Sequence, residues 1–81
     1  MDDAEILDRI HQIVDTRREL RRHLHDDPSD AEEARSRMRQ LEESLDQCWD
    51  LLRQRRAKEE FGDDPGGAEA RPVSEVEGYL Q

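Results

Sequence analysis

Two long stretches without glycine or proline, separated by a single proline, constrain this chain more than any other feature. Residues 4–26 and 29–61 contain neither residue, and Pro28 stands between them. Proline cannot donate the backbone hydrogen bond that a continuing helix requires, so one helix must end here and another begin. Helices joined by so short a turn run antiparallel. An all-α fold, an antiparallel two-helix hairpin, is therefore predicted.

Apolar residues recur in both stretches at alternating steps of three and four, which is the heptad pattern of a coiled coil. In the first stretch they are Ile6, Ile10, Ile13, Leu20 and Leu24, with Arg17 at the remaining core position. In the second stretch they are Ala31, Ala34, Met38, Leu41, Leu45, Cys48 and Leu52. We therefore expect a coiled-coil hairpin over residues 1–61, with helices at about 4–26 and 29–61.

The last part of the chain, residues 62–81, has a different composition. It opens with the run Gly62-Asp63-Asp64-Pro65-Gly66-Gly67, and residues 59–81 hold seven acids against one base, Arg71. A segment with so little apolar surface does not fold alone, so we expect a mostly irregular acidic tail. Val73, Val76 and Leu80 lie at helical spacing near its end. They indicate a terminal peptide that docks either on its own hairpin or on another protein.

Composition excludes most other classes of protein. The 81 residues are 32% hydrophobic, which suffices for one small domain but not for a nucleotide-binding sheet or a barrel. A net charge of −9 makes direct binding to nucleic acid unfavourable. One cysteine, an acidic N-terminus and the lack of an apolar run of about 20 residues predict a cytoplasmic protein without membrane contact.

Histidine and cysteine do not have the spacing of a metal site or of a catalytic pair. His11, His23, His25 and Cys48 show none of the paired spacings of zinc ligands. A thiol at the core position of Cys48 would be protonated and inaccessible to a substrate. We therefore expect no catalytic residue, no metal ion and no cofactor, and a protein that is not an enzyme.

The apolar series widens at the open end of the hairpin, away from Pro28. A two-helix hairpin leaves one side of its core in water, and an exposed tryptophan there is costly. We expect either the tail or a second chain to cover this surface, the second chain by completing a four-helix bundle as a dimer. The expected interface with a protein partner comprises Leu7, Val14, Trp49, Leu51, Leu52, Val73, Val76, Tyr79 and Leu80. The predicted function is a protein–protein interaction module that forms homo-oligomers.

The acidic turn supports an alternative function. Asp26, Asp27 and Asp30 surround Pro28 at the tip of the hairpin. Carboxylates at such a tip resemble those of the Gre-type transcript-cleavage factors, which implies a transcription effector that inserts its tip into RNA polymerase. Helix capping and the helix dipole account for the same acids without a partner. The globular polymerase-binding domain of those factors also has no counterpart here.

The block Leu45–Ala57, with the sequence LDQCWDLLRQRRA, resembles the signature of a small actinobacterial family of unknown function. The segments Glu5–Ile10 and Arg71–Tyr79 also resemble the pattern of this family, so the likeness covers most of the chain. It departs from that pattern at the turn around Pro28. The resemblance implies a bacterial setting and brings no activity with it.

Overall fold

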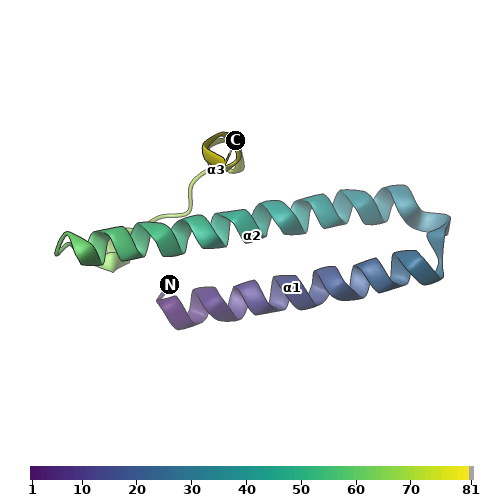
Figure 1. Cartoon of the computed structure of the whole chain (residues 1–81), viewed down its shortest axis with the longest axis horizontal. Helices are drawn as coiled ribbons and strands as arrows, with labels where there is room; N and C mark the ends of the chain where they lie inside the picture. The colour runs from purple at the N-terminus through teal and green to yellow at the C-terminus, as the bar shows by residue number, and fades with distance from the viewer. Residues whose placement is uncertain (81) are drawn as a thin grey trace.

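The computed structural model of the chain is a helical hairpin with a third helix laid across it (Figure 1). Helix α1 spans Asp3–Asp26, α2 spans Ala31–Glu60 and α3 spans Val73–Leu80, with short 3-10 turns η1 at Pro28–Asp30 and η2 at Pro65–Gly67. The structure describes the backbone of residues 1–80 and the side chains of residues 1–77. This range contains helices, turns and irregular segments but no strand, which confirms the predicted all-α class.

Acidic residues cap both ends of the first helix and the turn that follows it. The Asp2 carboxylate accepts a hydrogen bond from the Glu5 backbone N–H at 2.8 Å, and the Glu5 carboxylate accepts one from the Asp2 N–H at 3.4 Å. This reciprocal pair satisfies donors that the first turn of a helix leaves free. After α1, the Asp27 carboxylate accepts a hydrogen bond from the Ser29 N–H at 3.1 Å, and Pro28 begins η1. The chain reverses there and enters α2.

The hairpin has two unlike halves along its length. In the open half, residues 3–14 and 41–60, the buried core consists of Ile6, Ile10, Ile13 and Cys48, with Val14, Leu41, Leu45, Leu51 and Leu52 packed around it. In the turn half, residues 15–40, Ala34 is buried while Leu20 and Leu24 are only half-buried. The apolar core is thus concentrated at the end of the molecule that also carries the tail.

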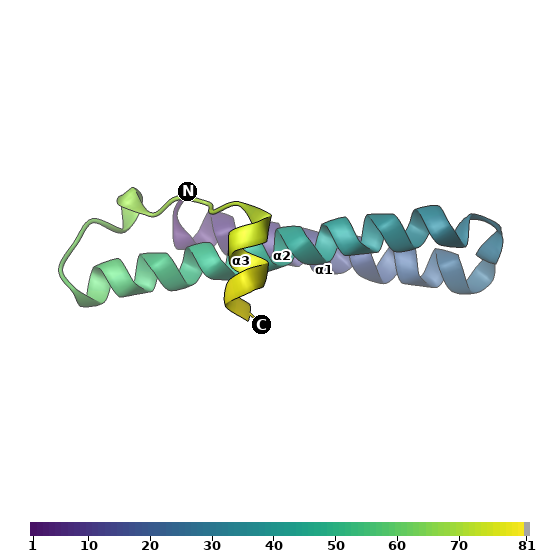
Figure 2. The ribbon, with the colours of Figure 1, turned by 90° about the horizontal axis from the view of Figure 1, so that it is seen from above.

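The tail folds back along α2 and crosses it. The chain reverses direction at Gly62, whose φ of +76° is a left-handed conformation that glycine adopts without strain. It then passes through η2 to α3, which lies on the side of α2 away from α1 (Figures 1 and 2). Val76 of α3 is 1% exposed. The open half therefore has three layers, with α2 in the middle.

The tail combines an irregular part with a short helix. Residues 62–72 form no regular element apart from η2, and a helix of 8 residues follows at Val73–Leu80, where the apolar residues have helical spacing. A helix this short is not stable alone in water, so packing against α2 must supply the missing stabilisation. Of the two predicted docking modes of the terminal peptide, the structure has docking on its own hairpin.

Candidate protein-binding surface and the Asp50 cluster

An apolar surface remains exposed on one side of the open half. Trp49 is 44% exposed and Leu7 is 40% exposed, although both border the buried core. Val14, seven residues after Leu7 and therefore on the same side of α1, is half-buried against that core. We call Leu7, Val14 and Trp49 the apolar face.

The two helices contribute to this face from the same side of the hairpin. A cavity on the opposite side is lined by Arg9 of α1 and by Cys48 and Leu51 of α2. At about 100° per residue, Leu7 lies about 200° around α1 from Arg9, and Trp49 lies about 200° around α2 from Leu51. Both side chains therefore project away from the cavity and share one face.

The described residues of the tail leave the apolar face uncovered, because they dock on another side of α2. Val76 is buried in that docked tail and is thus separated from Leu7, Val14 and Trp49. Among the other residues expected at a partner interface, Leu52 packs against the core, Leu51 lines the opposite cavity and Val73 is half-buried in α3. The side chains of Tyr79 and Leu80 lie outside the described residues. The described residues of the expected interface are therefore distributed over the apolar face, the core, the opposite cavity and the docked α3.

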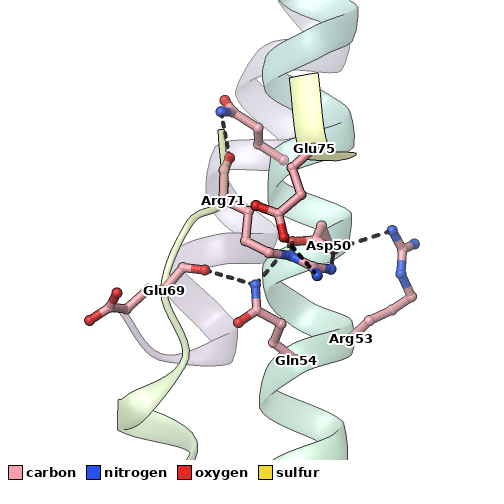
Figure 3. Close-up of polar contacts among 7 residues, drawn as sticks. Asp50, Arg53, Gln54, Glu69, Arg71 and Glu75 are labelled. Carbon is pink, nitrogen blue, oxygen red and sulfur yellow. Dashed lines mark hydrogen bonds and ion pairs between the residues drawn. The ribbon is translucent and has the colours of Figure 1, made fainter. Parts of the chain in front are cut away.

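Asp50, whose side chain is fully buried, holds the tail against α2 (Figure 3). Its carboxylate accepts hydrogen bonds from two guanidinium nitrogens of Arg71, one of them Nε at 2.9 Å, and a third from Gln54 Nε2 at 3.0 Å. Two-point pairing of this kind is among the stronger and more directional polar interactions in proteins. Arg53 lies 4.0 Å from the same carboxylate, and Glu75 of α3 lies 3.7 Å from Arg71. The hydrogen bonds from Arg71 hold the pKa of Asp50 below 3.8, although burial acts in the opposite direction.

Two glutamine side chains of α2 bind the backbone of the same segment. Gln54 Nε2 donates to the Glu69 carbonyl at 2.7 Å, and Gln47 Nε2 donates to the Arg71 carbonyl at 3.1 Å (Figure 3). Residues 47, 50 and 54 are three and four positions apart, so they form one row along α2. This row, which we call the Asp50 cluster together with Arg71, determines the path of the tail.

Beyond the Asp50 cluster, α3 brings acidic side chains together. A hydrogen bond to the Asp46 carboxyl, burial, and the negative charges of Asp46 and Glu43 all raise the pKa of Glu77 above 4.5. Like charges in contact disfavour ionisation of one another. The docking of α3 therefore combines one favourable ion pair with one unfavourable acidic contact.

Arg55 makes a second connection between the tail and the hairpin. Its Nε lies 2.6 Å from the Asp3 carboxylate, and its Nη1 donates to the carbonyls of Met1 at 2.8 Å and Pro65 at 3.2 Å. One guanidinium thus joins the start of α1, the end of α2 and η2. This connection fixes the open end of the hairpin as a single unit.

The acids of the tip do not converge on a site. Hydrogen bonds from Ser29 to the Asp27 carboxylate lower its pKa, and they show that this side chain serves as a cap. Asp30 caps no backbone group with its side chain. Among the described residues there is no group of three or more histidine, cysteine, aspartate or glutamate side chains that could hold a metal ion.

The single thiol of the chain is part of the core. Cys48 is buried, and its desolvation raises the pKa of the thiol, with Arg9 acting in the opposite direction. A thiol that stays protonated is a poor nucleophile. No helix in the described part of the chain is long and apolar enough to cross a membrane.

Together the fold and this surface define a small all-α hairpin protein with an exposed apolar face. The chain belongs to the family described as "Protein of unknown function (DUF2630)", whose model matches residues 2–81. The uncharacterised proteins Rv0898c of Mycobacterium tuberculosis and Mb0922c of Mycobacterium bovis are each 44% identical to it over 77 residues, which are 95% of this chain and 88% of the relative. No solved structure matches the chain.

These comparisons confirm the resemblance to an actinobacterial family of unknown function. They leave the function unknown, and they give no support to the alternative of an RNA polymerase effector.

Proposed function

We propose that this protein is a cytoplasmic, non-catalytic interaction module that binds another polypeptide through the apolar face. The observation that carries the proposal is the exposure of Trp49 beside Leu7, at 44% and 40%, in a chain whose own tail docks elsewhere. Tryptophan is enriched where one protein surface binds another. Binding would remove this apolar surface from water.

The chemistry of the remaining side chains supports an interaction protein rather than an enzyme. The buried Asp50 is fully engaged with Arg71 and Gln54, and Cys48 is enclosed in the core. The polar side chains with the shortest contacts, those of Asp50, Arg71 and Gln54, thus join the tail to α2 and are not available to a substrate. Self-association, which the sequence predicts, is one form that the proposed function can take.

Site-directed photocrosslinking tests this proposal. A photoreactive residue in place of Leu7 is compared with the same residue in place of Phe61, in living mycobacterial cells that express the chain. Phe61 is a matched control because it is apolar and 83% exposed but lies at the end of α2, away from the apolar face. We expect a discrete crosslinked product from position 7 and none from position 61.

The mass of the product distinguishes a second copy of this chain from a different protein, and either supports the proposal. Identical products from both positions, or no discrete product from position 7, would contradict it.

A further inference from the structure

We propose that the partner of the apolar face is an acidic amphipathic helix, because the same side of the hairpin is strongly basic in the turn half. This inference rests on the proposed function and specifies the chemistry of the partner. It begins from α1. Arg18 and Arg21 follow Val14 by four and seven residues, so they continue the side on which the apolar face lies. Both arginines are exposed.

The second helix continues the apolar face in the same way. Arg35 lies two heptads before Trp49, and Arg39 lies one helical turn beyond Arg35. Both are exposed. We call Arg18, Arg21, Arg35 and Arg39 the arginine patch.

Cavities between the helices show that the helix stretches carrying these two pairs of arginines lie side by side. One cavity is lined by Thr16 of α1 together with Arg37 and Leu41 of α2, and another by Leu20 together with Ala34 and Arg37. The stretch of α1 that carries Arg18 and Arg21 therefore lies alongside the stretch of α2 that carries Arg35 and Arg39. Arg37 borders both cavities, and at about 200° from its neighbours at positions 35 and 39 it faces the opposite side.

The members of the arginine patch make no ion pair with another described residue. The ion pairs among the described residues involve Arg53, Arg55 and Arg71 instead. Four exposed cations on one side of a chain of net charge −9 form a local attraction for a negative partner. Such a partner would lie along both helices, with its acids over the arginine patch and its apolar residues over the apolar face. Glu42 lies between Arg35 and Trp49 along α2, one heptad from each.

Other occupants fit this side less well. A second copy placed parallel would oppose arginines to arginines, and one placed antiparallel would oppose arginines to Leu7 and Trp49. The acidic tail of the same chain is held on another side of α2 by Asp50. A nucleic acid would have phosphates near the acidic tip and nothing to place on the apolar face.

Binding of two synthetic helical peptides tests the inference. Both carry leucine at heptad core positions, and they differ only in having glutamate or lysine at the charged positions of one half. Fluorescence anisotropy measures their affinity for the full chain. We expect the glutamate peptide to bind at least about tenfold more tightly than the lysine peptide, and its affinity to fall as salt is added.

Variants of the protein locate the effect. Arg18→Glu with Arg35→Glu is expected to weaken binding of the glutamate peptide about tenfold, whereas Arg37→Glu, on the opposite side, changes it less than about twofold. Circular dichroism verifies that both variants keep the helix content of the wild type. Equal losses from the two variants would overturn the inference.

Further outcomes separate this inference from the proposed function. If position 7 crosslinks to a partner but both peptides bind equally, the acidic partner is wrong and the apolar face stands. A crosslink to a second copy, or oligothymidylate binding that depends on Arg18 and Arg35, likewise overturns the inference alone. If there is no crosslink and neither peptide binds, both proposals fail.

Discussion

The open half and the turn half of the hairpin are built from the same two helices, yet they differ in depth. The open half buries three isoleucines and Cys48, and it has the tail packed on the back of α2. The turn half has two layers, half-buried leucines and exposed arginines. Burial of apolar surface is the main stabilising contribution in folding, so the open half must carry most of the stability. Both halves follow the heptad pattern, and the feature that distinguishes them is the third layer, which only the open half has.

The two halves also differ in what they contribute to stability and to partner binding. In the open half the tail covers the back of α2 and leaves the apolar face free. The turn half offers charge rather than apolar surface to a partner. Substitutions in each half should therefore differ in whether they change the free energy of unfolding or the affinity for a partner.

The largest expected effect comes from the core of the open half. Ile10→Ala should lower the free energy of unfolding by about 2–5 kcal/mol, because it removes a buried side chain and leaves a cavity. Leu24→Ala in the turn half should lower it by about 1 kcal/mol or less, because that side chain is already partly in water. Urea denaturation followed by circular dichroism measures both. Equal losses would show that the two halves do not differ in this way.

The next effect concerns the third layer. Asp50→Asn removes the negative partner of Arg71 and should cost about 1–3 kcal/mol, the lower part of the range being expected because the Arg71 side chain is 36% exposed. Hydrogen exchange should show faster exchange of the Val76 amide than in the wild type, while the Ile10 amide keeps its protection.

Glu75→Gln is the matched control for Asp50→Asn. It removes an exposed partner of the same arginine and should cost less than about 0.5 kcal/mol. If both substitutions release α3 equally, Asp50 does not anchor the tail.

A smaller effect is a pH dependence of the docking of α3. The pKa of Asp50 is lowered in the folded chain, so its contribution is present above 3.8 and is lost as the pH falls through the folded pKa. The pKa of Glu77 is raised, so its contribution is present below 4.5 and is lost as the pH rises through the folded pKa. Docking should therefore be strongest between pH 3.8 and 4.5.

Nuclear magnetic resonance of the Val76 methyl groups across this range measures the docking. Glu77→Gln should remove the weakening at higher pH and leave the weakening at lower pH unchanged. A wild-type profile that stays flat above pH 4.5 would contradict the role of Glu77.

Relative to the size of the side chain removed, the smallest loss of stability should come from Trp49. Trp49→Ala should cost about 1–2 kcal/mol, compared with about 3–5 kcal/mol for a fully buried aromatic residue, because Trp49 is already 44% exposed. Thermal unfolding measures the difference. A large loss would mean that Trp49 belongs to the core rather than to a binding surface.

The hairpin could be predicted from sequence because its determinants are local. Heptad spacing identifies which side of each helix is buried, and Pro28 marks the reversal. Heptad spacing and Pro28 together predict the all-α class. In the structure the core does form from heptad residues such as Ile10 and Cys48. Each of these signals can be read within a few residues of chain.

The path of the tail could not be predicted, because it depends on pairs that are far apart in sequence. Asp50 lies outside the heptad core positions and has the pattern of a solvated residue, yet its partner Arg71 is 21 residues away. Gln47 and Gln54 carry no signal that would distinguish them from surface glutamines. The one available indication was Arg71 itself, the single base among seven acids. A lone cation there indicates an acidic partner without revealing its position.

The turn between α1 and α2 also determines where the molecule tolerates added groups. The longest dimension is 51 Å, with the turn between α1 and α2 at one end of it and the end of α2 at the other (Figure 1). Met1 lies beside α2, with its carbonyl bound by Arg55. A fluorophore or an inserted peptide at residues 28–30 would therefore leave the core and the tail intact. A tag fused before Met1 would instead be attached next to the Arg55 contacts. Labelling at the turn is consequently the better way to follow this protein in cells.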